Sequence, residues 1–155
     1  MKTIVLGIGN PLLGDDGVGV HIAKKLKSRI QHPSVTVDEA YTGGMNLLDL
    51  IRGYDRAILI DTIYRYDQPV GTMSRYDIND LPTGHSSNPH DVTLKEAITL
   101  AKRLGDAQIP SQIVIYGIAV HEMSTEFSET LSLSLEKKLP SILQIILDEI
   151  QKENS

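Results

Sequence analysis

The chain has 155 residues, of which 41% are hydrophobic and 23% are charged, and it contains no cysteine. These proportions are those of an ordinary globular protein, and we expect a single domain over residues 1–155. The absence of cysteine excludes disulfides, thiolate metal ligands and a cysteine nucleophile. The net charge of −5 disfavours a nucleic-acid partner, because phosphates are bound through clusters of lysine and arginine.

No hydrophobic stretch approaches the roughly 20 residues that a membrane-spanning helix needs. The hydrophobic run at the N-terminus is interrupted by Gly7 and Gly9, which argues against a signal peptide. We therefore expect a cytoplasmic protein without membrane insertion, and we expect it to be a monomer.

The first predicted element is a buried β-strand at residues 3–8, followed by a glycine-rich loop at residues 9–17. Ligands of α/β sheets gather at the carboxyl ends of strands, so the loop is a candidate site. It fails the dinucleotide-binding fingerprint because Leu12 stands where glycine is required. It also fails as a phosphate-binding loop, because Asp15 and Asp16 replace the required lysine and hydroxyl residue. Two carboxylates would repel phosphate, so the loop suits a cation.

A helix is predicted from Asp16 to Arg29, where hydrophobic residues recur every three or four positions. Its acidic start suits the helix dipole. Asp15 is a favoured type of helix cap, and we expect that structural role for it. We interpret Asp16 as a site residue instead, because other polar residues are expected at the same edge of the sheet.

The rest of the chain alternates strands and helices, which predicts an α/β domain around a mainly parallel sheet. The further strands are predicted at 35–40, 56–63, 72–77 and 112–120, and the further helices at 45–51, 90–104 and in a last region from Leu131 to Ile150. Segments 3–8, 56–63 and 112–120 are the most continuously hydrophobic, as central strands are. Pro140 should kink the last helical region or split it in two.

Two further polar residues are candidates for the same site. Asp61 follows the hydrophobic run 57–60, so we expect its carboxylate at the carboxyl tip of a central strand. His90 lies in a polar loop that leads into the helix at 90–104, and His85 is a weaker candidate in the same loop. Each could instead have a structural role, as a turn cap for Asp61 or as a surface histidine for His90.

Two carboxylates and a neutral imidazole would form a site of oxygen and nitrogen ligands that suits zinc or nickel. Three protein ligands would leave positions open for water or a substrate atom.

Other catalytic arrangements are weaker, because no serine lies in a G-x-S-x-G motif. His121 and Glu122 begin like the H-E-x-x-H metalloprotease motif, but no second histidine follows, so we expect only a loop feature there.

The segment from Ile4 to Val20, IVLGIGNPLLGDDGVGV, resembles the signature of the hydrogenase maturation endopeptidases, and the resemblance extends over nearly the whole chain. These proteases remove a C-terminal extension from the large subunit of nickel-iron hydrogenases. The resemblance implies a three-layer αβα sandwich with a twisted, mainly parallel five-stranded sheet. It also implies an aspartyl-type endopeptidase whose catalytic and metal-binding residues are Asp16, Asp61 and His90.

The resemblance further implies a substrate-binding role for Asn10 in the first glycine loop and for Thr42, Gly43 and Gly44 in a second one. The chain departs from the family pattern before this second loop, where Glu39-Ala40 replaces Asp-Gly, and at Val120, where proline is common. These departures affect the surface that faces the substrate and leave the three metal-binding positions unchanged.

The expected partner is the large-subunit precursor, which would bring the nickel with it, and zinc or cadmium would occupy the same site in vitro. The metal would be either recognised only or used to polarise the scissile carbonyl. One alternative is a nickel-binding maturation chaperone with the same residues and no cleavage. A second is a peptidyl-tRNA hydrolase-like enzyme, suggested by the turn at Gly9-Asn10-Pro11 but disfavoured by the negative charge.

Overall fold

The computed structural model describes residues 1–41, 45–80, 89–121 and 126–154. In chain order the strands are β1 (Thr3–Ile8), β2 (Val35–Ala40), β3 (Arg56–Tyr64), β4 (Met73–Asp77) and β5 (Gln112–Val120). The α-helices are α1 (Val18–Arg29), α2 (Met45–Ile51), α3 (Pro89–Arg103) and α4 (Leu133–Asn154), and 3-10 turns cover Gly14–Gly17 and Ile78–Asp80.

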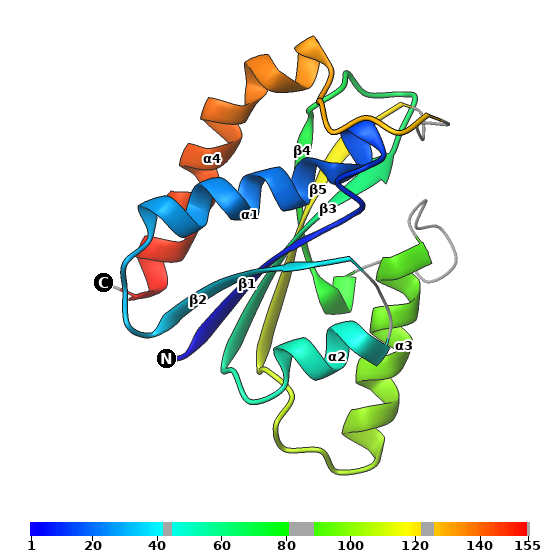
Figure 1. The fold of residues 1–155 in the computed structure, drawn as a ribbon. Helices are drawn as coiled ribbons and strands as arrows, with labels where there is room; N and C mark the ends of the chain where they lie inside the picture. Colours follow the sequence, from blue (N-terminus) through cyan, green and yellow to red (C-terminus); the bar gives the residue numbers. More distant parts are fainter. Residues whose placement is uncertain (42–44, 81–88, 122–125, 155) are drawn as a thin grey trace.

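The strand order is β2-β1-β3-β5-β4, in which the first four strands are parallel and β4 pairs antiparallel with β5 at the edge. Helices α1 and α4 cover one face of the sheet, and α2 and α3 cover the other (Figure 1). The predicted three-layer sandwich with a mainly parallel five-stranded sheet is therefore confirmed. The inner strands are β1, β3 and β5, as their continuous hydrophobic runs predicted.

The sheet separates two hydrophobic clusters, and β3 contributes to both because successive side chains of a strand point to opposite faces. Ala57 and Leu59 pack towards α2 and α3. Ile58 and Ile60 pack towards α1 and α4. By the same alternation, the side chain of Asp61 belongs to the face covered by α2 and α3, and that of Thr62 belongs to the face covered by α1 and α4.

The backbone of helix α1 lies directly against the sheet because its first turn contains a glycine where a side chain would not fit. A Cβ atom on Gly19 would overlap the carbonyl oxygens of Ile8 and Ile60, and one on Gly7 would overlap the carbonyl oxygen of Gly19. Gly9 has a φ of +148°, and a Cβ there would overlap the backbone carbonyl oxygen of Asp16. The glycines therefore place Asp16 directly beside the carboxyl end of β1.

Three helix predictions need correction. Helix α1 begins at Val18 rather than Asp16, because the 3-10 turn Gly14–Gly17 precedes it. Helix α4 is not split at Pro140, which lies on its exposed side and removes only one backbone donor. Helix α3 begins one residue earlier than predicted, at Pro89, a residue suited to the first turn of a helix. No helix in the described part of the chain is both long and apolar enough to cross a membrane.

Candidate active site

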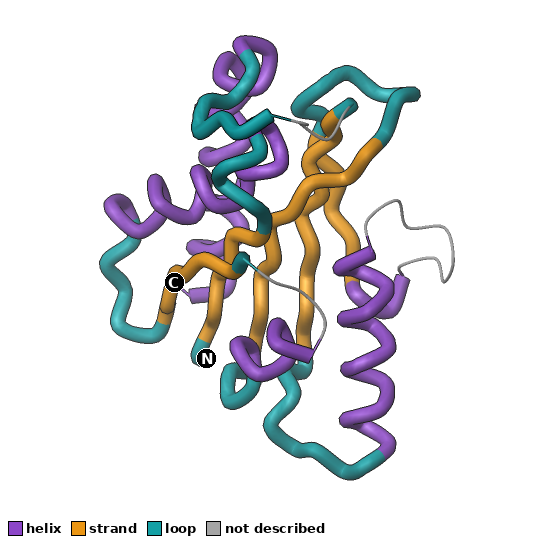
Figure 2. The backbone as a smooth tube through the Cα atoms, turned by 45° about the vertical axis from the view of Figure 1, so that its right-hand side comes forward, coloured by secondary structure: helices purple, strands orange, loops and turns teal. Residues whose placement is uncertain are grey.

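The loop that follows β1 and the last residues of β3 lie at the same end of the sheet (Figure 2). Side chains from this loop and from β3 meet there. The Tyr64 hydroxyl donates a hydrogen bond to Oδ1 of Asp16 at 2.6 Å. The Thr62 hydroxyl lies 3.4 Å from the same oxygen. The backbone N–H of Asn10 donates to Oδ2 of Asp16 at 2.9 Å. The Asp16 carboxylate is therefore held by neutral donors from two elements.

The environment of Tyr64 keeps its hydroxyl protonated. Burial raises the pKa of Tyr64 well above its ordinary value of 10.0, and the hydrogen bond to Asp16 and its negative charge raise it further. The charge of Asp61 raises the pKa of Tyr64 as well, by a smaller amount. Tyr64 is therefore a hydrogen-bond donor throughout the neutral pH range, and both carboxylates act on it electrostatically.

Asp61 lies within β3 and not at its tip, contrary to the prediction. The hydrophobic run ends at Ile60, but β3 continues to pair with β5 as far as Tyr64 and Val120. Asp61 is only 1% exposed, and its Oδ1 accepts the backbone N–H of Thr62 at 2.8 Å. Asp61 is nevertheless close to a strand end, because the neighbouring β1 stops at Ile8 and its pairing with β3 stops at Ile60.

The two predicted carboxylates approach this end from different sides of the sheet. Thr62 and Tyr64, which contact Asp16, face the layer of α1 and α4, whereas Asp61 faces the layer of α2 and α3. Strand β1 ends at Ile8 and its pairing with β3 ends at Ile60, so residues 61–64 of β3 extend beyond β1.

His90 lies in the first turn of α3, the helix that covers the face to which Asp61 belongs. Its side chain lies outside the part of the structure that is described, as do His85, Thr42, Gly43 and Gly44 in full. Among the described residues, no three histidine, aspartate or glutamate side chains converge to hold a metal. The assignment of Asp16, Asp61 and His90 as metal ligands therefore stays a prediction.

Asp15 has the structural role expected of it, but at a different helix. The N-cap residue of α1 is Gly17, and the Asp15 carboxylate instead accepts the backbone N–H of Ser132 at 2.7 Å, immediately before α4. Two backbone bonds join the same segments, from Gly14 N–H to the Ser128 carbonyl and from Ser128 N–H to the Leu12 carbonyl, both at 2.8 Å. The glycine loop is therefore tied to the segment that precedes α4.

Asn10 and His121 have structural contacts in the described structure. The Asn10 side chain accepts the Leu12 backbone N–H at 3.0 Å and so closes the turn, and its predicted contact with substrate stays a prediction. Nε2 of His121 lies 2.6 Å from the Gln68 carbonyl oxygen, and its ring stacks on Tyr66 with 6.0 Å between centroids. For His121, this agrees with the expected loop role.

Sequence reasoning missed Thr62 and Tyr64. The signal that could have found them is the alternation of the predicted strand 56–63. It places Thr62, and Tyr64 one residue beyond the predicted end, on the face of Ile58 and Ile60.

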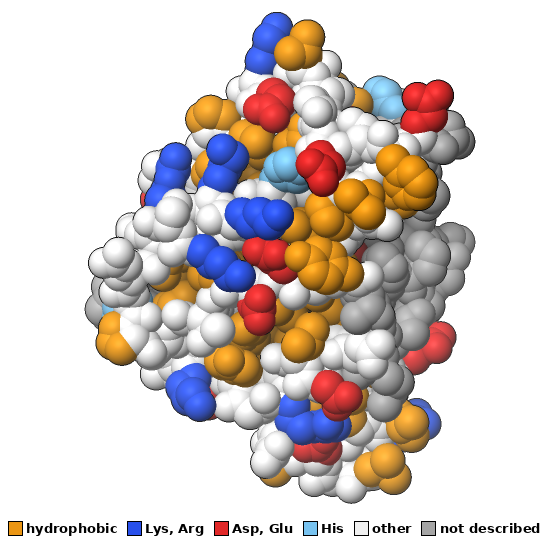
Figure 3. Space-filling view, in the orientation of Figure 1, with side chains coloured by type: hydrophobic (Ala, Val, Ile, Leu, Met, Phe, Trp, Pro, Cys, Tyr) orange, Lys and Arg blue, Asp and Glu red, His pale blue; other side chains and the backbone are white. Residues whose placement is uncertain are grey.

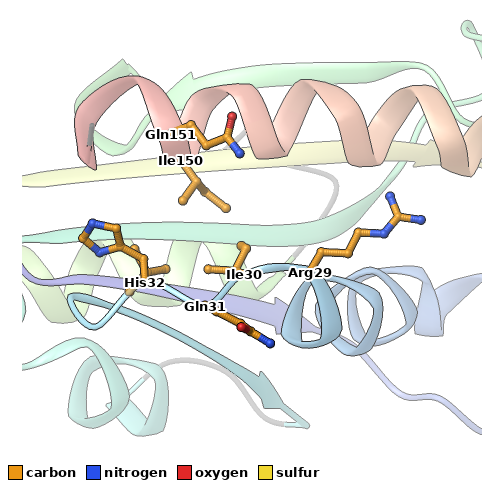
Figure 4. A pocket seen from close by; sticks show the side chains of 7 residues that line it. Arg29, Ile30, Gln31, His32, Ile150 and Gln151 are labelled. Atoms are coloured by element: carbon orange, nitrogen blue, oxygen red, sulfur yellow. The ribbon is translucent and has the colours of Figure 1, made fainter.

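A separate hollow lies at the opposite, amino end of the sheet, between the C-terminal ends of α1 and α4 (Figure 4). It is lined by Arg29, Ile30, Gln31, His32, Val35, Ile150 and Gln151. None of the predicted site residues lines it, and it is not part of the candidate active site.

Comparisons with known proteins agree with the resemblance stated above. The family model described as hydrogenase maturation protease matches residues 20–149, which include Asp61 and His90 and begin just after Asp16. The chain is 27% identical over 151 residues to the hydrogenase expression/formation protein HupD of Thiocapsa roseopersicina, covering 95% of this chain and 66% of that protein. It is 26% identical over 148 residues to the hydrogenase 2 maturation protease of Escherichia coli, covering 92% and 89% respectively.

A solved structure, the hydrogenase maturating endopeptidase HybD from E. coli, has a TM-score of 0.76 and 24% identity to the chain, covering 99% of this chain and 94% of that one. At this level of identity the likeness shows a shared fold. The match to the family model favours a protease over the peptidyl-tRNA hydrolase alternative.

Proposed function

Because the chain belongs to the hydrogenase maturation protease family, we propose that it removes the C-terminal extension of a nickel-iron hydrogenase large-subunit precursor. In this proposal the nickel arrives inside the precursor and is part of the substrate. Asp16, Asp61 and His90 bind that nickel, so only a metal-loaded precursor is cut. The observation that supports this most directly is the Asp16 carboxylate, which neutral donors hold at the carboxyl end of the sheet.

The chemistry of these side chains suits the proposed role. Among the described residues, no lysine, arginine or histidine forms an ion pair with Asp16, so its negative charge is available to a cation. Carboxylate oxygens and an imidazole nitrogen are suitable ligands for nickel. Zinc or cadmium would occupy the same residues in vitro. Asn10, Thr42, Gly43 and Gly44 would contact the precursor.

Hydrolysis requires a base as well as a position for the peptide. The oxygen of a water molecule bonds to the scissile carbonyl carbon, the carbon–nitrogen bond breaks, and a proton from the water reaches the new amine. A carboxylate oxygen that the metal leaves free would accept the proton first and then donate it. The nickel either positions the scissile bond alone or also polarises its carbonyl.

The test is to incubate the purified protein with nickel-loaded and nickel-free precursor and to weigh the large subunit by mass spectrometry. We expect loss of a C-terminal peptide from the loaded precursor only. Equal cleavage of both would contradict nickel recognition and leave the protease assignment intact. Binding of the loaded precursor without cleavage would support the chaperone alternative.

The proposal includes a monomer that acts in the cytoplasm. Sedimentation of the purified protein would measure the oligomeric state, and fractionation of the source cells would locate the protein.

A further inference from the structure

Large apolar side chains are exposed at the end of the sheet that carries the candidate site. Each of the four parallel strands is followed by one of them: Tyr41 after β2, Leu12 after β1, Tyr66 after β3 and Phe127 after β5. Figure 3 shows hydrophobic side chains gathered beside the ends of β1 and β2. We call these four residues the apolar rim. Exposed apolar patches bordered by polar residues mark interaction surfaces.

Phe127 is the most exposed member at 84%, and the segment that presents it is tied to the loop of Asp16. Its neighbour Ser128 exchanges backbone hydrogen bonds with Leu12 and Gly14, and Ser132, further along, binds the Asp15 carboxylate. Leu12 and Phe127 are therefore displayed side by side on a preformed backbone. A partner that binds them is placed directly next to Asp16.

The shape and charge of this end indicate what kind of partner fits. Four adjacent strand ends extend over about 14 Å, which is wider than a small ligand. The charged groups described on these loops are mostly acidic: Asp15, Asp16, Glu126 and Glu129, with Arg65 paired to Asp67 at 2.9 Å. The complementary surface has apolar side chains at its centre and lysine or arginine around them.

We propose that the apolar rim is the docking surface for the hydrogenase large-subunit precursor, which binds it through an apolar patch with basic residues at its edge. The inference rests on the proposed function, because the occupant is the protein whose extension is cut. Docking at the rim brings the extension to the Asp16 loop, since Leu12 and Asp16 belong to the same tied segment.

The test compares Phe127→Ser with Leu104→Ser. Leu104 is similarly exposed, at 77%, but lies just beyond the C-terminal end of α3, away from the site. The dissociation constant of each full-length variant for the loaded precursor would be measured by biolayer interferometry. We expect Phe127→Ser to weaken binding by about tenfold or more, as loss of an interface anchor does, and Leu104→Ser to change it less than about twofold. Thermal unfolding of Phe127→Ser should match the wild type, because the side chain is exposed.

Equal binding by Phe127→Ser and wild type would overturn the proposal that the apolar rim is the docking surface, and it would leave the protease assignment untouched. Binding that depends on Phe127 in a wild-type protein that never cleaves the precursor would overturn the proposed peptidase activity and leave the docking proposal in place. A second copy of this chain is the other possible occupant. Light scattering that shows a dimer in the wild type and a monomer in Phe127→Ser, with unchanged precursor binding, would overturn the proposal in favour of self-association.

Discussion

Charged side chains are held by specific partners at both ends of the sheet, but the partners differ in charge. At the carboxyl end, the donors described around Asp16 are two hydroxyls and a backbone N–H, all neutral. At the amino end, the fully buried Arg56 is paired with Glu149 at 3.4 Å, and Arg75 binds the same carboxylate at 2.7 Å. Neutral donors orient a carboxylate without cancelling its charge, whereas two guanidinium groups cancel it.

This difference separates a candidate site from a structural ion pair. Buried polar groups occur at both ends, so burial by itself does not identify function. An oriented but uncompensated carboxylate attracts a cation, while a compensated pair has no remaining attraction for one. Mutations at the two ends should therefore affect different properties, namely processing at the carboxyl end and stability at the amino end.

The largest effect is expected for Asp16→Ala, which should reduce processing of the loaded precursor by at least about a hundredfold. The substitution removes a proposed metal ligand, and losses of that size follow when a group that stabilises the transition state is deleted. The fold should persist because Asp16 is only partly buried. Processing would be followed by mass spectrometry, and the fold by circular dichroism.

The matched control is Asp15→Asn, which keeps an acceptor for the Ser132 N–H and should keep most of the activity. Normal processing by Asp16→Ala would contradict the proposal that the carboxyl end of the sheet carries the active site. Asp61→Ala and His90→Ala are expected to behave like Asp16→Ala. Full activity in His90→Ala would transfer the assignment to His85.

The second effect in size belongs to the amino end, where Glu149→Leu should lower the free energy of unfolding by about 3–5 kcal/mol. The substitution leaves Arg56, whose side chain is 0% exposed, as a buried charge without its partner. Urea denaturation would measure the loss. At temperatures where the variant is folded, cleavage should proceed at the wild-type rate. A large loss of cleavage with unchanged stability would contradict the separation of the two ends.

The sequence predicted the sheet well because the signal for a buried strand is local. β1, β2 and β5 begin and end where predicted, and the continuous hydrophobic runs identified the inner strands. The site was predicted less completely. The strand was predicted at 56–63, one residue short of the observed β3, but Asp61 was treated as its tip because the hydrophobic run stops at Ile60. The residues beyond Asp61 were therefore not considered, and Thr62 and Tyr64 were overlooked.

Other features depend on contacts between distant parts of the chain, which no local pattern encodes. Asp15 precedes helix α1 and is a residue type that often caps helices, yet its carboxylate accepts the backbone N–H of Ser132, before α4. Pro140 predicted a kink or a split of the last helical region, and the split is wrong: α4 runs unbroken from Leu133 to Asn154, with Pro140 exposed and Leu139 and Leu143 in the hydrophobic core. That no described lysine, arginine or histidine pairs with Asp16 is likewise visible only once its neighbours are known.

A smaller effect at the carboxyl end is expected for Tyr64→Phe, which should weaken binding of cadmium or nickel ions by about tenfold. The Tyr64 hydroxyl fixes Asp16 at 2.6 Å, and without it the carboxylate gains rotational freedom that binding must remove. Because the pKa of Tyr64 is raised, its hydroxyl stays protonated and the ratio of affinities should be constant from about pH 7 to 9. Isothermal titration calorimetry of the wild type and the variant at several pH values would measure the cation affinities and their ratio.

The control for this substitution is Tyr76→Phe, which removes a hydroxyl from β4, a strand that lies at the far edge of the sheet. It should leave cation affinity unchanged. Tighter cation binding by Tyr64→Phe would mean that the hydroxyl competes with the metal for Asp16 and does not position it.

The smallest effect is expected for Arg56→Met, which should change the free energy of unfolding by less than about 1 kcal/mol. Nε and Nη1 of Arg56 are buried without a hydrogen-bond partner in the described structure, so the guanidinium is poorly compensated for its loss of hydration. Glu149 keeps Arg75 at 2.7 Å after the substitution, so no carboxylate is left unpaired. A loss comparable to that of Glu149→Leu would show instead that Arg56 itself stabilises the amino end. The near-neutral result would show that Glu149 is needed at this end chiefly because Arg56 is buried there.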